Sequence, residues 1–445
     1  MANEGAASQG TKERYTSRIK LLLLSQRAAI SLHRAQGYFE HARLDTLRSA
    51  NTPNDKNAIV LQSGGVTAVI NQSLAGVVQE AARHPAIGEI YGAIHGMDGL
   101  LANELRDLNR QPRGTWPAIA RTPGAALGSA RRKLQPMEVP QALDRLRELG
   151  VAYLFAIGGN DSAETAHLLA LEATSRGYDL TVVGVPKTVD NDLPEMDHCP
   201  GYGSSARFVA LATMGAGRDA ESMGHASPIT IIEVMGRNAG WLAAAAALGK
   251  REERDAPHVI CFPETRFVEE RFIAQTEEAY RRWGFAVAVV NENIKDDHGP
   301  VGHKGEPLIV DDFGHPYYQS PGQYLAGQLS RRLGVRVRFE KPGTIQRSLT
   351  ACTSDVDAAE AYLVGKEAVR AAVAGHTDVM VTLLRSSSVT YQCTTGLAPL
   401  EAIAGRERVM PSRYVDAATG LPTKGFVEYA QPLIGAPLPR FARLR

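Results

Sequence analysis

Short apolar segments alternate along the chain with longer segments in which apolar residues recur every three or four positions. Short, often β-branched apolar runs are typical of buried strands, and the longer periodic pattern is typical of amphipathic helices. The predicted strands are NAIVLQ, EIYGAIHG, AYLFAIGG, LTVVGVP, ITIIEVM, HVICFPE, FAVAVVNE and DVMVTLL. The predicted helices include VINQSLAGVVQEAARH, PQALDRLREL, SAETAHLLALEATSRG and VEERFIAQTEEAYRRW.

The order of strand, turn and helix repeats along the chain, which predicts an α/β protein with parallel sheets covered by helices on both faces. In such folds ligands bind at the carboxyl ends of the strands, so the loops after the apolar runs are the candidate sites. A chain of 445 residues exceeds the usual size of a single hydrophobic core. We therefore expect at least two domains.

The first 56 residues do not follow this alternation. Their leucine run covers only residues 21–24 and is followed by Ser25, Gln26 and Arg27, so it is too short for a signal peptide or a membrane span. Acidic residues in the segment also argue against a transit peptide. We expect residues 1–56 to form a helical extension that covers the body or a neighbouring subunit, with a mobile tail as the alternative.

Composition excludes some classes of partner. The hydrophobic content of 44% is that of a soluble globular protein, and the net charge of +1 gives no reason to expect a nucleic-acid or membrane partner. The four cysteines are far apart and form no CxxC pair or metal-site spacing. They are typical of isolated thiols in a reducing compartment, so we expect a cytoplasmic protein.

Two loops carry paired glycines directly after predicted strands. Gly64 and Gly65 follow the first strand, and GGNDSAET, residues 158–165, follows the third. Glycines in such loops allow backbone N–H groups to approach a phosphate at a helix N-terminus. The structural alternatives are a tight turn in the first loop and a helix cap by Ser162 or Asp161 in the second. Because the pattern repeats, the two loops could face each other across one phosphate chain.

The loop VPKTVDNDL, residues 185–193, combines a lysine with two aspartates. Pro186 favours an extended chain, in which Asp190 and Asp192 would project on the same side. One carboxylate could accept a hydroxyl proton while the other binds Mg²⁺, and Lys187 could stabilise a departing phosphoryl oxygen. A solvated acidic turn is the alternative.

Three arginines also follow or lie near predicted strand ends. Arg237 is part of EVMGRNAGW, and Arg338 and Arg347 flank the turn in RFEKPGTIQRS. Guanidinium groups suit bidentate recognition of phosphate or carboxylate. Surface arginines at strand ends are also common, so these residues alone do not establish a sugar-phosphate site.

Six motifs together carry a family resemblance. In chain order they are GGVTAVIN, LGSAR, GGNDS, PKTVDND, EVMGRNAGW and TIQRS. Their order resembles that of the phosphofructokinases over about residues 57–350. The resemblance implies two Rossmann-like three-layer domains. The implied ranges are 57–194 for the pyrophosphate and magnesium domain, 195–385 for the sugar-phosphate domain, and 386–445 for a segment that packs on the body or at a subunit interface.

The resemblance also implies phosphoryl transfer to the 1-hydroxyl of fructose 6-phosphate, with Asp190 as the proton acceptor. The implied substrate-binding residues are Thr188, Val189, Asp190, Met235, Gly236, Arg237, Glu292, Arg338, Thr344 and Arg347. The implied donor-phosphate contacts are Gly65, Arg131 and Lys187. Asn160 and Asp192 are the implied ligands of the cofactor, Mg²⁺.

Two positions bear on the identity of the phosphate donor. Members that use ATP typically carry GGDGS and PGTIDND, whereas this chain has GGNDS and PKTVDND. Asp161 adds a carboxylate where a nucleotide's inner phosphate would pass, which disfavours ATP by volume and by charge. Lys187 adds a compensating cation for a small, densely charged donor. The pair resembles the pyrophosphate-dependent branch, whose reaction is usable in both glycolysis and gluconeogenesis.

Other positions depart from the family pattern. Asn160 replaces an expected metal carboxylate, and Thr344 replaces a histidine or tyrosine at the hexose site. Pro228 stands where many members have an arginine that reaches a neighbouring subunit, and Met97 replaces an aromatic residue near the donor. These positions leave open the metal coordination, one hexose contact and the contribution of a second subunit.

Three other functions remain as alternatives. The chain could be an ATP-dependent 6-phosphofructokinase, a lipid or NAD kinase of related architecture, or a non-catalytic sugar-phosphate sensor. The lipid and NAD kinases offer no counterpart to EVMGRNAGW and TIQRS, and retention of Asp190 and Lys187 argues against a sensor. The resemblance further implies a homodimer or homotetramer.

Overall fold

The computed structural model describes residues 56–132, 134–303, 309–310, 316–317, 319–386 and 390–444. The described residues belong to one compact unit, Asp55–Arg445. The predicted helical extension therefore lies outside the described residues, apart from Lys56, which begins the first strand.

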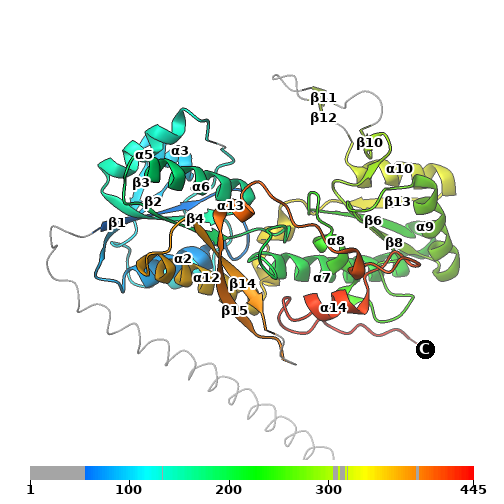
Figure 1. Ribbon diagram of the computed structural model, residues 1–445. Coiled ribbons are helices and arrows are strands. Elements are labelled where there is room, and N and C mark those ends of the chain that lie inside the picture. Colours follow the sequence, from blue (N-terminus) through cyan, green and yellow to red (C-terminus); the bar gives the residue numbers. More distant parts are fainter. Residues whose placement is uncertain are drawn as a thin grey trace, which may run out of the picture. The chain divides into compact units, whose positions relative to one another are not determined.

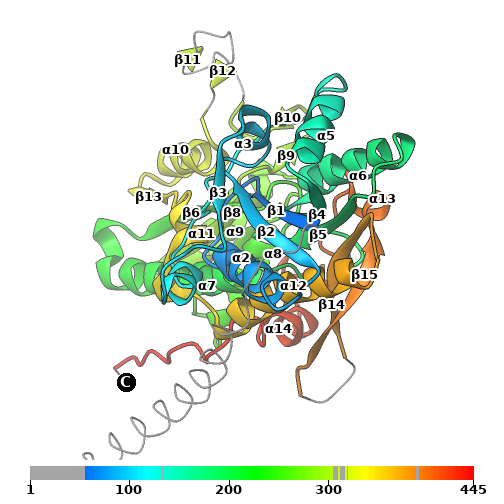
Figure 2. The ribbon, with the colours of Figure 1, turned by 90° about the vertical axis from the view of Figure 1, so that its left-hand side faces the viewer.

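The first sheet has seven strands in the order β15-β14-β5-β4-β1-β2-β3 (Figures 1 and 2). Its strands are β1 (Lys56–Gln62), β2 (Ile87–Ala93), β3 (Leu105–Asp107), β4 (Val151–Gly158), β5 (Thr181–Pro186), β14 (Val379–Arg385) and β15 (Cys393–Pro399). β1, β2, β4, β5 and β14 are parallel. β3 and β15 pair antiparallel at the two edges.

Helices cover both faces of this sheet (Figure 1). On one face lie α3 (Met97–Ala102), α5 (Glu138–Glu148), α6 (Asn160–Ser175) and α13 (Leu400–Ile403). On the other lie α2 (Ile70–Ala81), α4 (Thr115–Ala120) and α12 (Asp355–Val373). Side chains of β4 alternate between these layers: Leu154 and Ala156 pack in the first, Phe155 and Ile157 in the second. This alternation makes the strand apolar on both faces.

The second sheet has four parallel strands in the order β13-β6-β8-β7. They are β6 (Ile229–Val234), β7 (Val259–Cys261), β8 (Ala286–Asn291) and β13 (Val337–Glu340). One face packs against α7 (Tyr202–Met223), α8 (Trp241–Ala245) and α14 (Lys424–Ala430), the other against α9 (Glu269–Trp283) and α10 (Pro321–Leu333). The remaining short elements are α11 (Ile345–Ser348), β9 (Lys295–Asp296), β10 (Gly299–Pro300), β11 (Ile309–Val310) and β12 (Pro316–Tyr317).

The expected alternation of strands and helices is confirmed, because every predicted strand and each of the four predicted helices is present. The expectation of parallel sheets is also confirmed, and the first sheet carries one antiparallel strand at each edge. Its edge strands β3 and β15 are antiparallel, since each follows its neighbour through a connection too short for a parallel crossover. None of the described helices combines the length and the apolar character that a membrane span needs.

The chain returns to the first sheet after completing the second. β14 lies within the range 195–385 but pairs with β5, and α12 packs with α2 on the first sheet. Within 386–445, β15 joins the first sheet and α14 packs in the core of the second. The proposed domain limits remain predictions, and these strand pairings show that the two sheets do not correspond to two continuous stretches of chain.

One prediction follows from a half-buried histidine that directly precedes β7 of the second sheet. His258 Nδ1 accepts the Val287 N–H at 3.0 Å, and burial lowers the pKa of His258 to about 4 from its ordinary 6.5. As the pH falls from about 6.5 to 4, the unfolded chain takes up a proton that the native protein excludes. The free energy of unfolding should therefore decrease, by on the order of 3 kcal/mol from this residue.

Denaturant unfolding at several pH values tests this. His258→Asn preserves an acceptor for Val287 without a titrating ring, so its stability should fall less between pH 6.5 and 4 than that of the parent. Equal slopes for both proteins would contradict the assignment.

Candidate active site

A cavity of about 420 Å³ lies at the carboxyl ends of strands from both sheets. It is lined by the loops after β1, β4 and β5, which are neighbours in the first sheet, and by the loops after β6 and β8 of the second. The predicted site residues that line it are Gly65, Arg131, Asn160, Asp161, Lys187, Thr188, Val189, Asp190, Asp192, Met235, Arg237, Glu292 and Arg347. The strand-end rule therefore brings most of the candidates together.

The two glycine loops face each other across this cavity. The Oγ atoms of Ser63 and Ser162 form a hydrogen bond of 2.5 Å between the loop after β1 and the start of α6. A Cβ atom added to Gly65 would lie only 2.5 Å from Nη1 of Arg347. Glycine at this position lets a guanidinium group and the loop backbone approach the same space.

The N-terminus of α6 has no side-chain cap. The helix begins at Asn160, with Gly159 as the N-cap residue. The predicted cap by Ser162 or Asp161 is wrong, because both residues lie inside the first turn and Ser162 bonds Ser63 instead. The first-turn amides of a helix without a cap are donors for an anion. Asp161, whose side chain is exposed at the cavity, adds a negative charge beside them.

The loop after β5 is turned rather than extended. Asn191 has a φ of 58°, in the left-handed region, so the predicted extended alternation of Asp190 and Asp192 is wrong. Thr188 Oγ1 accepts the Asp190 N–H at 3.1 Å, which tightens the turn. Asparagine tolerates this conformation better than most residues. Both carboxylates nevertheless line the cavity.

Lys187 connects three strand-end loops. Its Nζ donates a hydrogen bond of 2.7 Å to the Gly65 carbonyl oxygen, and its backbone N–H donates to the carbonyl oxygen of Gly158 at 3.0 Å. The residue is only 3% exposed. Burial lowers the pKa of Lys187 to about 8, against the opposing effect of Asp190 and Asp192. The side chain is therefore a buried cation between the loop after β1 and the two acidic groups, Asp190 and Asp192.

Asp190 has the electrostatic setting of a proton acceptor. Burial, followed by the negative charges of Asp192 and Glu292, raises the pKa of Asp190 to about 7, although Arg237 and Lys187 act in the opposite direction. A carboxylate with a pKa near neutrality can be unprotonated before a reaction and still bind a proton during it.

The loop after β6 forms the other wall. Gly236 has a φ of 141°, and a Cβ atom there would lie 2.5 Å from the Ala239 carbonyl oxygen. Only glycine allows this turn. It places Arg237 at the cavity, where the Arg237 N–H donates to Glu292 Oε1 at 3.3 Å.

Two more arginines, Arg131 and Arg347, supply positive charge at the cavity. Arg347 Nε is buried and has no hydrogen-bond partner among the described residues. Burial and the nearby Arg131 lower the pKa of Arg347. Two guanidinium groups held close together, one with an unpaired buried donor, form a site that an anion would complete.

Arg338 and Thr344 do not line this cavity, so the single chain does not bring them to the predicted substrate site. Arg338 lies within β13, where Nε donates to Ser227 Oγ at 2.8 Å and Nη1 pairs with Asp219 at 3.0 Å. It lines a separate hollow against α7. Thr344 is exposed and directly precedes α11.

Arg408 is a contributor that sequence reasoning did not find. Its guanidinium donates to the carbonyl oxygens of Asn191, Met196 and Asp197 at 2.7, 2.5 and 2.6 Å. Its backbone N–H also donates to the Asp192 carbonyl oxygen at 2.6 Å. One residue of the C-terminal segment therefore holds the turn at Asn191 and Asp192 and the chain that follows it to Asp197.

Other buried groups hold the same turn. The Asn191 side chain donates to the Tyr429 hydroxyl at 2.8 Å and accepts the Cys199 N–H at 2.9 Å. Trp241 lies under the Arg408 guanidinium, 4.8 Å from its carbon to a ring centroid. Nothing local in the sequence links these positions, because more than 200 residues separate Arg408 from Asn191.

The fold and the cavity together define a phosphotransferase of the α/β class. The model of the phosphofructokinase family matches residues 57–372. A pyrophosphate–fructose 6-phosphate 1-phosphotransferase of Rhodospirillum rubrum is 38% identical over 395 residues, which is 87% of this chain and 96% of the relative. The enzyme of the same name from Halomonas elongata is 37% identical over 394 residues, 86% and 93% of the two chains.

The crystal structure of a pyrophosphate-dependent phosphofructokinase from Nitrosospira multiformis is also similar, with a TM-score of 0.79 and 35% identity over 87% of this chain and 94% of that one. The chain belongs to the phosphofructokinase family.

The contacts of Arg408 generate a prediction. Arg408→Lys keeps the charge but cannot reach three carbonyl groups at once, so the turn should shift and kcat for phosphoryl transfer should fall by about 10- to 100-fold. The control is Arg406→Lys, because Arg406 contacts the site through its backbone carbonyl, which accepts from Asn160 Nδ2.

Steady-state kinetics and thermal unfolding of both variants are the measurements. We expect the control to retain the parent kcat. Unchanged kcat in a folded Arg408→Lys protein would show that the contacts do not position the turn.

Proposed function

We propose that the protein catalyses reversible phosphoryl transfer from pyrophosphate to the 1-hydroxyl of fructose 6-phosphate. The products are fructose 1,6-bisphosphate and phosphate, so the reaction can serve glycolysis and gluconeogenesis. The observation that carries the proposal is the placement of Lys187 and Asp161 on one cavity with Asp190. The relatives with the highest identities named above support the same donor and acceptor.

The donor preference rests on the α6 N-terminus and on Lys187. Asp161 lies in the first turn of α6, where it presents a carboxylate to any phosphate chain that continues past the turn. Lys187 Nζ donates a hydrogen bond of 2.7 Å to the Gly65 carbonyl oxygen. A short pyrophosphate chain can use this cation without passing the carboxylate, whereas the longer chain of ATP meets like charge.

The reaction is an in-line displacement. Asp190 accepts the proton of the sugar 1-hydroxyl as its oxygen attacks the transferred phosphorus. The P–O bond to the leaving phosphate breaks, and Lys187 stabilises the charge that develops there. Arg131 and Arg347 hold phosphate oxygens, while Arg237 and Glu292 orient the sugar phosphate.

The oxygen donors at the cavity fit Mg²⁺, which prefers carboxylate, amide and phosphate oxygens. Asp192 and Asn160 would hold the ion. Asn160 is 8% exposed and Asp192 is 5% exposed, and both line the cavity. When bound, the ion would neutralise charge on pyrophosphate. The amide of Asn160 supplies no charge, so Asp192 would be the main protein ligand.

An ATP-dependent 6-phosphofructokinase and a non-catalytic sugar-phosphate sensor are the alternatives. The exposed Asp161 carboxylate disfavours the first. The raised pKa of Asp190, due mainly to burial, disfavours the second because a binding site has no need of a poised base. We also propose that the protein acts in the cytoplasm and forms a homodimer or homotetramer. Sedimentation would measure the oligomeric state.

Lys187→Ala tests the charge role. Loss of the buried ammonium should lower kcat with pyrophosphate by about 100- to 1,000-fold, as for removal of other groups that stabilise transition-state charge. Lys424→Ala is the control, because its side chain is 89% exposed and pairs with Glu428. Near-parental activity of a folded Lys187→Ala enzyme would show that the assigned role is wrong.

The donor assignment has its own test. Asp161→Gly should increase ATP use, because the carboxylate no longer repels the inner phosphates. In the double variant Asp161→Gly with Lys187→Gly the preference should shift further toward ATP, because activity with pyrophosphate also falls. The measured quantity is the ratio of kcat/KM for ATP to that for pyrophosphate. An unchanged ratio in an active double variant would refute the donor argument.

A further inference from the structure

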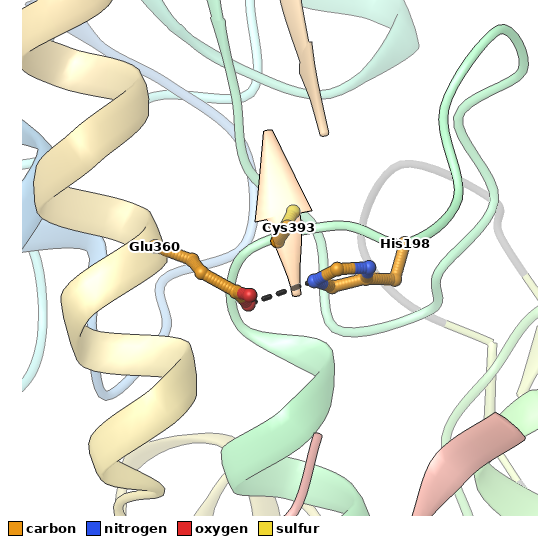
Figure 3. Close-up of side chains that lie close together, drawn as sticks. All are labelled: His198, Glu360 and Cys393. Carbon is orange, nitrogen blue, oxygen red and sulfur yellow. Dashed lines mark hydrogen bonds and ion pairs between the residues drawn. The ribbon is translucent and has the colours of Figure 1, made fainter. Parts of the chain in front are cut away.

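Three potential metal ligands meet outside the substrate cavity. His198, Glu360 and Cys393 place one nitrogen, one carboxylate oxygen and one sulfur within 4.8 Å of one another. They come from the loop after β5, from α12 and from the first residue of β15 (Figure 3). Figure 3 shows Glu360 projecting from α12 toward the imidazole ring, with the Cys393 sulfur beside the pair.

The imidazole ring is oriented as it is in many metal sites. His198 Nδ1 bonds Asp197 Oδ1 at 2.8 Å, which leaves Nε2 directed at Glu360 Oε2 at 2.7 Å. A carboxylate on one ring nitrogen is the usual support for a histidine that binds metal through the other. The Tyr391 hydroxyl also belongs to this cluster, because it donates to Glu360 and lies 3.3 Å from His198 Nε2.

We propose that His198 Nε2, a Glu360 carboxylate oxygen and the Cys393 thiolate bind a divalent transition-metal ion, with Zn²⁺ as the best fit. A mixed nitrogen, oxygen and sulfur set suits Zn²⁺, whereas Mg²⁺ takes oxygen ligands. Water or the Tyr391 oxygen takes the fourth position. The proposed metal site would be structural, because none of its three ligands lines the described substrate cavity. The proposal does not depend on the reaction proposed above.

The neighbouring charges suit a cation at this position. His198 lies between the Asp197 and Glu360 carboxylates, at 2.8 and 2.7 Å, and Asp197 also pairs with Arg385 at 3.0 Å. The two carboxylates would offset the charge of a divalent cation. Binding through the thiolate would release the thiol proton to solvent.

The distances between the three ligand atoms also allow an ion to bind. Ligand atoms around tetrahedral Zn²⁺ lie roughly 3.4 to 3.6 Å apart. The His198–Glu360 pair is now at 2.7 Å, and no pair among the three ligand atoms exceeds 4.8 Å. Side-chain movements on the order of 1 Å are sufficient. Cys393 is only partly buried, which leaves a route for the ion.

Zn²⁺ at this position would join three distant parts of the chain. His198 follows the turn that carries Asp190 and Asp192, Glu360 belongs to a helix on the first sheet, and Cys393 begins its edge strand. The ion would therefore strengthen the attachment of the β14–β15 edge to the loop behind the substrate cavity.

The test uses the full chain after removal of metal by a chelator, with Zn²⁺ and Co²⁺ as probes. We expect one Zn²⁺ per chain, a higher thermal midpoint with Zn²⁺, and a thiolate-to-metal charge-transfer band with Co²⁺. Cys393→Ser should lose the band and weaken Zn²⁺ binding by at least about 100-fold, because it removes a direct ligand. Cys352→Ser is the matched control, since Cys352 is a free cysteine in a different element, and it should behave as the parent.

His198→Gln gives a second variant, which keeps hydrogen-bonding capacity but should also lose the Co²⁺ band. Absence of that band in the parent protein, or a band that persists in Cys393→Ser, would overturn the proposal. The cluster would then be a hydrogen-bonded ion network without a metal. Activity with pyrophosphate, measured separately, reports on the proposed function and does not decide this outcome.

Discussion

The ammonium group of Lys187 lies buried at 2.7 Å from the carbonyl oxygen of Gly65, and the geometry of the cavity depends on this contact. Burying a charged group costs several kcal/mol unless hydrogen bonds and opposite charges offset the loss of water. The Gly65 carbonyl and the nearby Asp190 and Asp192 supply that compensation. The loops after β1 and β5 are therefore held together by the same cation that we propose acts on the phosphate.

The acidic side of the cavity has to keep two like charges, Asp190 and Asp192, close together. Two aspartates close together in a turn disfavour each other's ionised form, and Asn191 between them adopts a left-handed backbone conformation. Such a turn persists only where the surrounding structure determines it. Arg408 and Tyr429 do this from the C-terminal segment. The conformation of the turn thus depends on residues that lie more than 200 positions away in the chain.

The periodic apolar pattern predicted eight strands of the two sheets but not β3, β13 or β15. It succeeded for β1, β4 and β5 because they are apolar on both faces, with β4 ending at Gly158 and β5 at Pro186. The rule that ligands bind at the carboxyl ends of parallel strands then located most of the cavity. Pattern could not reveal the return of β14 to the first sheet, since sheet order depends on pairing between distant segments.

For the same reason sequence spacing did not identify Arg408, or the approach of Cys393 to His198. The extended form predicted for the loop after β5 was wrong because hydrogen bonds from distant residues impose a turn there. Arg338 and Thr344 lie away from the cavity in the single chain, since β13 directs Arg338 toward Ser227 and Asp219.

We propose that Lys187 and Asp161 together select pyrophosphate over ATP as the phosphate donor. The most direct measurement is the initial rate of fructose 1,6-bisphosphate formation by the purified protein with Mg²⁺ and equal concentrations of either donor. We expect a rate with pyrophosphate at least about 100-fold above that with ATP, equivalent to about 2.7 kcal/mol of discrimination. An equal or higher rate with ATP would contradict it.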